Sequence, residues 1–279
     1  MDYRFGFIKR GLAGELFGFL CDKNVSSITI LSISILSVLY FFIINIALKT
    51  TWNNPKSYYR MLFFVIFLLS QYIVFSAHLI GYLDHIIFLL TILAVYLTIR
   101  NKILLASLVA VFSIFIHEIS VVLLLPICCF AIIVNEMPER KICIRDIFSR
   151  NLLTKLVLFL IFPFFTAVFI SFYQEINGGS YYAQLFSYLR QSSIPANVSD
   201  SVCSAYTKSF TYYLREQYGH FLQRIFISKA TIFYGIPILF SLWMVFKEFK
   251  LKQNIHLFIV LILITGVPLI LHSIAYDTY

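Results

Sequence analysis

Long hydrophobic stretches, separated by short polar segments, run along almost the whole chain. A stretch of roughly 15–25 mostly apolar residues is about the length that an α-helix needs to cross the hydrocarbon core of a bilayer. Eight stretches approach this pattern: 27–47, 61–80, 84–99, 103–116, 119–134, 156–173, 231–246 and 255–273. The pattern predicts an all-α fold, a polytopic membrane helical bundle of about eight spans with one long outer loop.

One polar dipeptide, His117-Glu118, interrupts the apolar stretch 103–134. At about 1.5 Å per residue, this stretch is too long for a single straight span. We therefore predict either two short helices with a tight connection or one broken helix at this point.

Lysine and arginine concentrate in four of the connecting segments, at 48–60, 100–102, 135–155 and 247–254. The alternate segments hold few positive charges for their length: 81–83, His117-Glu118, 174–230 and the C-terminal tail. Because basic residues collect in cytoplasmic loops, eight spans would put every basic segment inside and every other segment outside.

Composition narrows the class of protein further. Of the 279 residues, 60% are hydrophobic and 13% are charged, against about 45–50% and about 25% in soluble domains. A soluble enzyme, a disordered chain, a coiled coil and a disulfide-stapled module are excluded, because no soluble fold of this length buries so much apolar surface. The net charge of +9 fits cytoplasmic loops, so the expected partner is the lipid bilayer and not nucleic acid.

The pattern divides the chain into four parts. These are an outer-face juxtamembrane segment (1–26), a membrane helical core (27–173), an extracytoplasmic loop (174–230) and C-terminal membrane helices (231–279). The basic residues of the first part are poorly suited to crossing a membrane unaided, so we expect a helix to precede them in a longer protein. In the loop, Asn177-Gly178-Gly179 is a turn signal, and its many tyrosines are either membrane-interface anchors or platforms that stack on sugar rings.

Ionisable residues at membrane depth are costly and therefore mark candidate sites. The first group lies near the N-terminus and combines one carboxylate with three cations: Asp2, Arg4, Lys9 and Arg10. Its functional interpretation is a catalytic base beside a lipid-phosphate site, with the following residues forming a short helix flat on the membrane. The alternative is a basic terminus that only touches anionic lipid.

Three further groups lie on the same predicted face. They are Asp84-His85 at the start of a span, His117-Glu118 at the break, and His272 with Asp277 after the last span. Each has a structural alternative: a helix N-cap, a loop turn, and a solvated chain end. Together, these carboxylates and imidazoles suggest general-base chemistry at the outer leaflet, with nearby Arg or Lys neutralising a departing phosphate. No Cys/His cluster with metal-ligand spacing is present, so no metal site is predicted.

The stretch 84–134 resembles the membrane core of the GT-C superfamily of polyprenyl-linked glycosyltransferases, and also membrane polymerases of bacterial surface polysaccharides. The resemblance lies in an Asp that opens a span (Asp84), a basic turn (Arg100-Asn101-Lys102), and a span that ends in His117-Glu118 before a Pro-containing helix (Pro126). Asp2, followed by the amphipathic segment 11–20, is similar in placement to the family's catalytic Asp. We expect the helix that the family has before this Asp to precede residue 1 in a longer protein.

The resemblance implies an inverting, hexosyltransferase-like enzyme at the outer face of the bacterial inner (plasma) membrane. A polyprenyl-(di)phosphate-linked sugar would be the donor, and a glycan or lipid-linked molecule of cell-envelope polysaccharide, such as O-antigen, the acceptor. Asp2 would be the base, and Arg4, Lys9 and Arg10 would hold the phosphate. Asp84 or Glu118 would orient the acceptor or a divalent cation, and His85, His117, His272 and Asp277 complete the candidate site.

Two other classes of function stay open at this point. A flippase or transporter of a lipid-linked sugar would place polar residues in mid-membrane and show internal repeats, which this sequence lacks. A non-catalytic membrane subunit would tolerate replacement of all the outer-face carboxylates.

Overall fold

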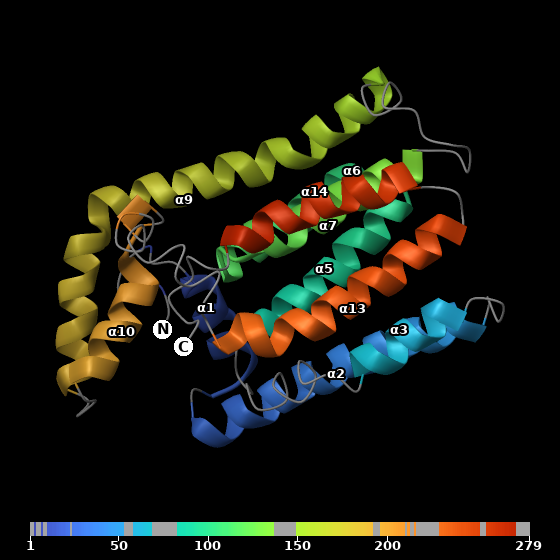
Figure 1. Cartoon of the computed structure of the whole chain (residues 1–279). Helices are drawn as coiled ribbons and strands as arrows, with labels where there is room; N and C mark the ends of the chain where they lie inside the picture. Colours follow the sequence, from blue (N-terminus) through green and yellow to red (C-terminus); the bar gives the residue numbers. More distant parts are fainter. Residues whose placement is uncertain are drawn as a thin grey trace.

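The structure is a computed structural model of the chain, shown in Figure 1. It describes residues 3, 7, 10–22, 24–52, 58–68, 83–136, 149–191, 196–209, 211, 212, 215, 229–251 and 255–271. Ten helices are named within these ranges: α1 (Gly11–Leu20), α2 (Val25–Trp52), α3 (Tyr58–Leu68), α5 (Asp84–Ile99), α6 (Ile103–Ile116), α7 (Ser120–Glu136), α9 (Arg150–Gln191), α10 (Ala196–Thr207), α13 (Lys229–Leu251) and α14 (Ile255–Leu271). The described part of the chain contains no strand, so the prediction of an all-α fold is confirmed.

Every apolar stretch that the sequence marked overlaps one of these helices. In the described residues, α2 and α9 are the two helices both long and apolar enough to cross a membrane. Helices α5, α6 and α7 are equally apolar but shorter, at 16, 14 and 17 residues. The break at His117-Glu118 is also confirmed, because α6 ends at Ile116 and α7 begins at Ser120.

The centre of the fold is a layer of helices that run side by side, with α5, α6, α7 and α14 at its core (Figure 1). Small side chains such as Ala106 and Ala110 are fully buried where these helices meet, which lets the backbones approach closely. The buried hydroxyl of Ser107 on α6 donates a hydrogen bond of 2.7 Å to the carbonyl of Phe159 on α9. This contact ties α9 to the core.

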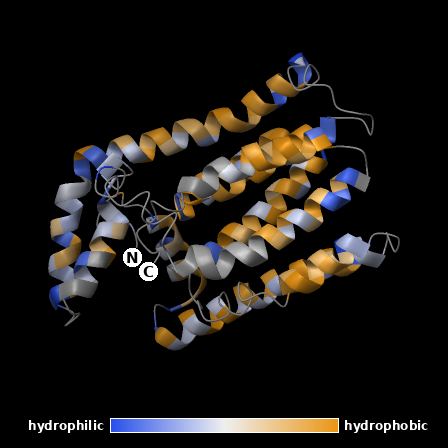
Figure 2. Ribbon diagram, in the orientation of Figure 1, coloured by the Kyte–Doolittle hydropathy of each residue, from blue (hydrophilic) through white to orange (hydrophobic). Residues whose placement is uncertain are grey.

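Hydrophobic residues predominate along α2 and along the part of α9 beside α6 (Figure 2). On α9, Phe164, Phe165 and Phe172 are 61%, 63% and 65% exposed. Only 17% of the most apolar window of each helix is buried inside the molecule. A helix from the core of a soluble protein would bury most of such a window, so the low burial favours a membrane helix for α2 and α9.

Polar residues lie at the ends of the helices and apolar residues lie between them (Figure 2). At one end, the turn from α5 to α6 places Asn101 in the left-handed region at φ 57°, and its side-chain oxygen accepts a hydrogen bond of 3.1 Å from Lys155 Nζ. Lys155 also pairs with Glu136. The His117-Glu118 corner lies at the other end of α6, about 21 Å away for a helix of 14 residues.

Helix α9 corrects one prediction. Asn177-Gly178-Gly179 is not a turn, because α9 continues through it to Gln191. Figure 1 shows α9 changing direction between the part beside α6 and the part beside α10. The second part is stabilised by packing of Leu185 and Leu189 against Cys203 of α10, and this tertiary contact outweighs the local preference of two glycines for a turn.

Candidate functional site

The corner between α6 and α7 is stabilised by hydrogen bonds between its own residues. His117 ends α6 in an extended conformation, with φ −158° and ψ 124°. The hydroxyls of Ser113 and Ser120 lie 2.7 Å apart and tie the two helix ends together, and Ser120 Oγ donates to the carbonyl of His117. The side chains of His117 and Glu118 are thereby presented at the end of the bundle.

Arg10 reaches this corner from the start of α1, 108 residues earlier in the chain. Its Nε and Nη2 donate to the two carboxylate oxygens of Glu118, at 3.2 and 2.9 Å. The pair is partly buried, with the side chains 19% and 31% exposed. Two parallel hydrogen bonds between a guanidinium and a carboxylate form a strong and geometrically specific ion pair.

Helix α1 reaches the corner because its apolar face packs there. Ala13 is buried with Ile87 of α5 and Ile116 of α6, and Leu12 and Leu16 pack against this cluster. Arg10 precedes the helix with φ 60°, a left-handed conformation that is uncommon outside glycine. The short helix predicted after Arg10 is present as α1, and its predicted place flat on the membrane stays a prediction.

Asp84 and His117 face each other across the same end. His117 Nδ1 accepts a hydrogen bond of 3.1 Å from the backbone N–H of Ile119. A neutral His117 therefore carries its proton on Nε2, which lies 4.0 Å from Oδ1 of Asp84. Asp84 begins α5, where the helix dipole favours a negative charge. The two groups are close enough for their charges to interact but lie beyond hydrogen-bond distance.

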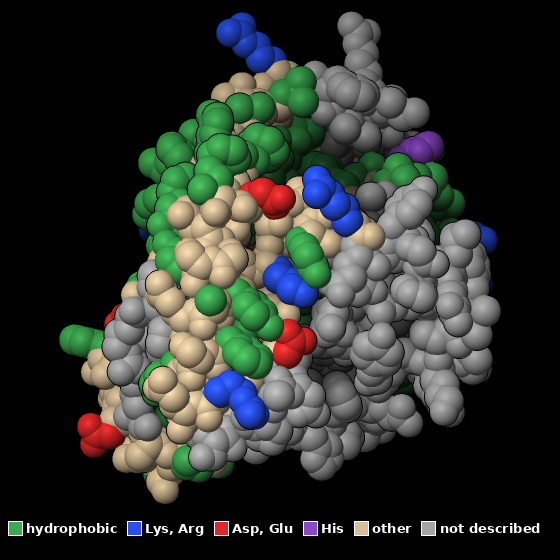
Figure 3. All heavy atoms as spheres, turned by 90° about the vertical axis from the view of Figure 1, so that its left-hand side faces the viewer, with side chains coloured by type: hydrophobic (Ala, Val, Ile, Leu, Met, Phe, Trp, Pro, Cys, Tyr) green, Lys and Arg blue, Asp and Glu red, His purple; other side chains and the backbone are tan. Residues whose placement is uncertain are grey.

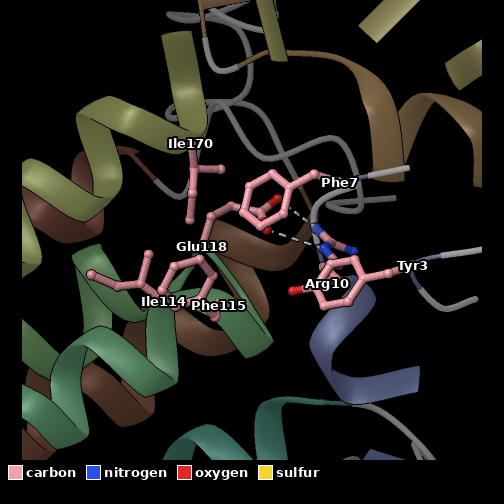
Figure 4. A pocket seen from close by; sticks show the side chains of 7 residues that line it. All are labelled: Tyr3, Phe7, Arg10, Ile114, Phe115, Glu118 and Ile170. Carbon is pink, nitrogen blue, oxygen red and sulfur yellow. Dashed lines mark hydrogen bonds and ion pairs between the residues drawn. The ribbon is translucent and has the colours of Figure 1, made fainter. Parts of the chain in front are cut away.

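Aromatic rings surround the apolar side of the site. Phe7 lies edge-on to Phe115, Phe169 and Tyr173, with ring centroids 6.0, 6.1 and 5.2 Å away. The carbonyl of Phe7 accepts a hydrogen bond of 2.8 Å from the buried side chain of Gln174. A small pocket lies between Phe7, Arg10 and Glu118 (Figure 4). Its interior of about 10 Å³ is about the space of one water molecule.

Helix α10 contributes Tyr206 to the site. The guanidinium carbon of Arg10 lies 6.0 Å from the centre of the Tyr206 ring, within range of a cation–π contact. Burial raises the pKa of Tyr206, Arg10 opposes this rise, and Glu118 adds to it. The phenol therefore stays neutral at pH 7. Figure 3 views this end of the molecule, where side chains of both charges lie among hydrophobic ones.

The structure describes five of the residues that the sequence marked as candidates and brings four of them together. Four of them form the site described above: Arg10, Asp84, His117 and Glu118. His85 follows Asp84 but is buried inside the bundle, with 4% of its surface exposed. Asp2, Arg4, Lys9, His272 and Asp277 lie outside the described residues, and their roles stay predictions.

The sequence did not single out Phe7 or Gln174 as parts of the site. Gln174 directly follows the apolar stretch 156–173, and a lone amide at the end of a predicted span was a usable signal. It is 2% exposed. Tyr206 was noticed only as one of several tyrosines in the loop.

The arrangement supplies the parts that general-base chemistry at a phosphate-bearing substrate needs. Asp84 offers a partly exposed carboxylate, with its side chain 35% exposed, next to a histidine. Arg10 offers a guanidinium whose fork geometry suits a phosphate as well as a carboxylate. Among the residues that the structure describes, no three His, Cys, Asp or Glu side chains group closely enough to hold a metal ion.

Comparisons with known proteins give no further guide to this site. No family model, no curated protein and no solved structure matches this chain. The resemblance to GT-C enzymes therefore rests on the residues of the sequence alone.

Proposed function

We propose that the chain is a multi-pass protein of a bacterial inner membrane in which all eight apolar stretches cross the bilayer. The exposed apolar surfaces of α2 and α9 support this, because only a bilayer or a large apolar partner would cover them. The shorter helices would cross with their ends close to the interfaces. Arg100 and Lys102 would lie inside, and Asp84 and Glu118 would lie outside.

Cysteine labelling from each side of the membrane tests this topology. In a variant without native cysteines, Asn24→Cys and Thr211→Cys are expected to react with an impermeant maleimide from outside, and Lys102→Cys only after the cells are opened. These positions are exposed and lie at opposite ends of the helices. Reaction of all three from the same side would contradict the proposed topology.

We propose further that the protein is a glycosyltransferase or polysaccharide polymerase that uses a polyprenyl-(di)phosphate-linked sugar at the outer face. The observation that supports this best is the gathering of Arg10, Asp84, His117 and Glu118 at one end of the bundle, opposite the basic turn. A site at that depth can meet a lipid-linked phosphate at the membrane surface and a polar acceptor from the aqueous side.

In the proposed reaction, Asp84 accepts the proton of an acceptor hydroxyl. The oxygen attacks the anomeric carbon of the sugar, and the bond from that carbon to the phosphate oxygen breaks. The lipid (di)phosphate leaves with the electron pair, and Arg10 neutralises its charge. Asp84 is the best described candidate for the base because its side chain is 35% exposed and lies beside His117, whereas both carboxylate oxygens of Glu118 accept hydrogen bonds from Arg10.

A transfer assay tests the proposed function directly. The purified protein in nanodiscs is given radiolabelled polyprenyl-diphosphate sugar and an envelope glycan acceptor. We expect label in the glycan and release of the lipid (di)phosphate. Movement of the labelled lipid between leaflets without transfer would support a flippase instead. Neither transfer nor movement, over a range of donor sugars, would favour a non-catalytic subunit.

A further inference from the structure

The carboxylate of Glu118 occupies the part of Arg10 that a phosphate would use. Both oxygens of Glu118 accept hydrogen bonds from the edge of the guanidinium formed by Nε and Nη2. A phosphate presents two oxygens to the same edge in the same planar arrangement. The two anions therefore compete for one set of donors.

The surroundings of Arg10 favour an anion at the position of the Glu118 carboxylate. Helix α1 begins at Gly11, so Arg10 stands at the positive end of the helix dipole, which favours an anion nearby. The small pocket opens beside the pair and is lined by Tyr3, Phe7 and Ile170. The ring of Tyr206 lies 6.0 Å from the guanidinium carbon, within range of a cation–π contact that does not involve the carboxylate.

We propose that Glu118 is an internal competitor that holds Arg10 until a phosphate anion displaces it. This inference rests on the proposed function for the identity of the anion, a phosphate or diphosphate group carried by a lipid. Binding of the anion transfers Arg10 from the carboxylate to the phosphate and separates Glu118 from its cation. Without substrate, the ion pair neutralises the charge of Arg10 and occupies its hydrogen-bond donors. Glu118 thereby lowers the affinity of Arg10 for the phosphate.

Equilibrium binding to variants of the pair tests this inference. Detergent-solubilised Glu118→Gln is titrated by calorimetry with inorganic pyrophosphate and with a short-chain polyprenyl phosphate. We expect it to bind about tenfold more tightly than the unmodified protein, because a charge-assisted competitor has been removed. Glu118→Ala should show the same gain. Arg10→Gln should bind more weakly than the unmodified protein.

A second ion pair provides a matched control. Arg60 and Glu248 form a pair with a distance of 2.6 Å and similar partial burial, but they lie on α3 and α13. Glu248→Gln also removes one carboxylate from an arginine and is expected to leave both affinities unchanged. An equal gain in this variant would show a general charge effect and overturn the inference.

The two probes distinguish the source of the phosphate. A gain with both shows that the phosphate group alone is recognised, and a gain only with the lipid shows that the apolar chain is needed as well; either result supports the inference. No gain in either Glu118 variant would overturn it. Because the readout is binding, transfer by the unmodified protein together with no gain would reject this inference and leave the proposed function in place.

Discussion

Replacing Asp84 with asparagine is expected to reduce sugar transfer by about 10²–10⁴-fold, the usual contribution of a general base. Asparagine keeps the size and the hydrogen-bonding oxygen of aspartate, but it cannot take up the acceptor's proton. We expect the rate to fall while the Michaelis constant for the lipid donor changes little, because Arg10 and not Asp84 would contact the phosphate. The measurement is the initial rate in the nanodisc assay.

Asp22 offers a matched control for this variant. It is an exposed aspartate just after α1 and lies outside the site. Asp22→Asn is expected to keep the activity of the unmodified protein. If Asp84→Asn folds with an unchanged melting temperature and also keeps full activity, Asp84 is not the base, and the role returns to the predicted Asp2.

Replacing Gly178 with alanine is expected to destabilise the contact between α9 and α10 by about 1–3 kcal/mol, the usual cost of overpacking. A Cβ atom at this position would lie 2.3 Å from the carbonyl oxygen of Thr207. That oxygen belongs to the backbone, so a side-chain rotation cannot relieve the clash and α10 must move. Because α10 carries Tyr206, the same change should also disturb the surroundings of Arg10.

The neighbouring glycine separates this clash from the general effect of a glycine-to-alanine change. A Cβ at Gly179 would meet no atom within 4 Å. Alanine is favoured over glycine inside a helix by roughly 0.5–1 kcal/mol, so Gly179→Ala should be neutral or slightly stabilising. The test compares the melting temperatures of the two variants and the rate at which protease cuts between α9 and α10. Equal melting temperatures would show that the close approach of Gly178 to Thr207 does not matter.

The helices of this protein were predictable from the sequence because their signal is local. An apolar stretch bounded by polar residues defines a helix wherever it lies in the fold. The corner at His117-Glu118 was predictable for the same reason, as two ionisable residues in a long apolar run are costly unless they reach a polar environment. The separation of basic turns from acidic and imidazole groups also followed from the order of the segments.

The course of α9 was not predictable in this way. Two adjacent glycines favour a turn when judged by their neighbours in sequence. The helix continues through them because Gly178 allows α10 to pack closely and Leu185 fills the interface with Cys203. Local preference amounts to about 1 kcal/mol per glycine, and packing of several side chains exceeds it.

The sequence by itself determined where the apolar helices lie, that α6 and α7 separate at His117-Glu118, and that Arg10, Asp84, His117 and Glu118 are candidates for one site. Only the tertiary structure decided that Arg10 pairs with Glu118, that Tyr206 lies over the guanidinium, and that Gln174 binds the backbone of Phe7. Helix formation depends on residues within a few turns of one another. In contrast, Arg10 and Glu118 are 108 residues apart in the chain, and Phe7 and Gln174 are 167 residues apart. Such pairings follow from how the helices pack, and a pattern along one chain carries no record of that.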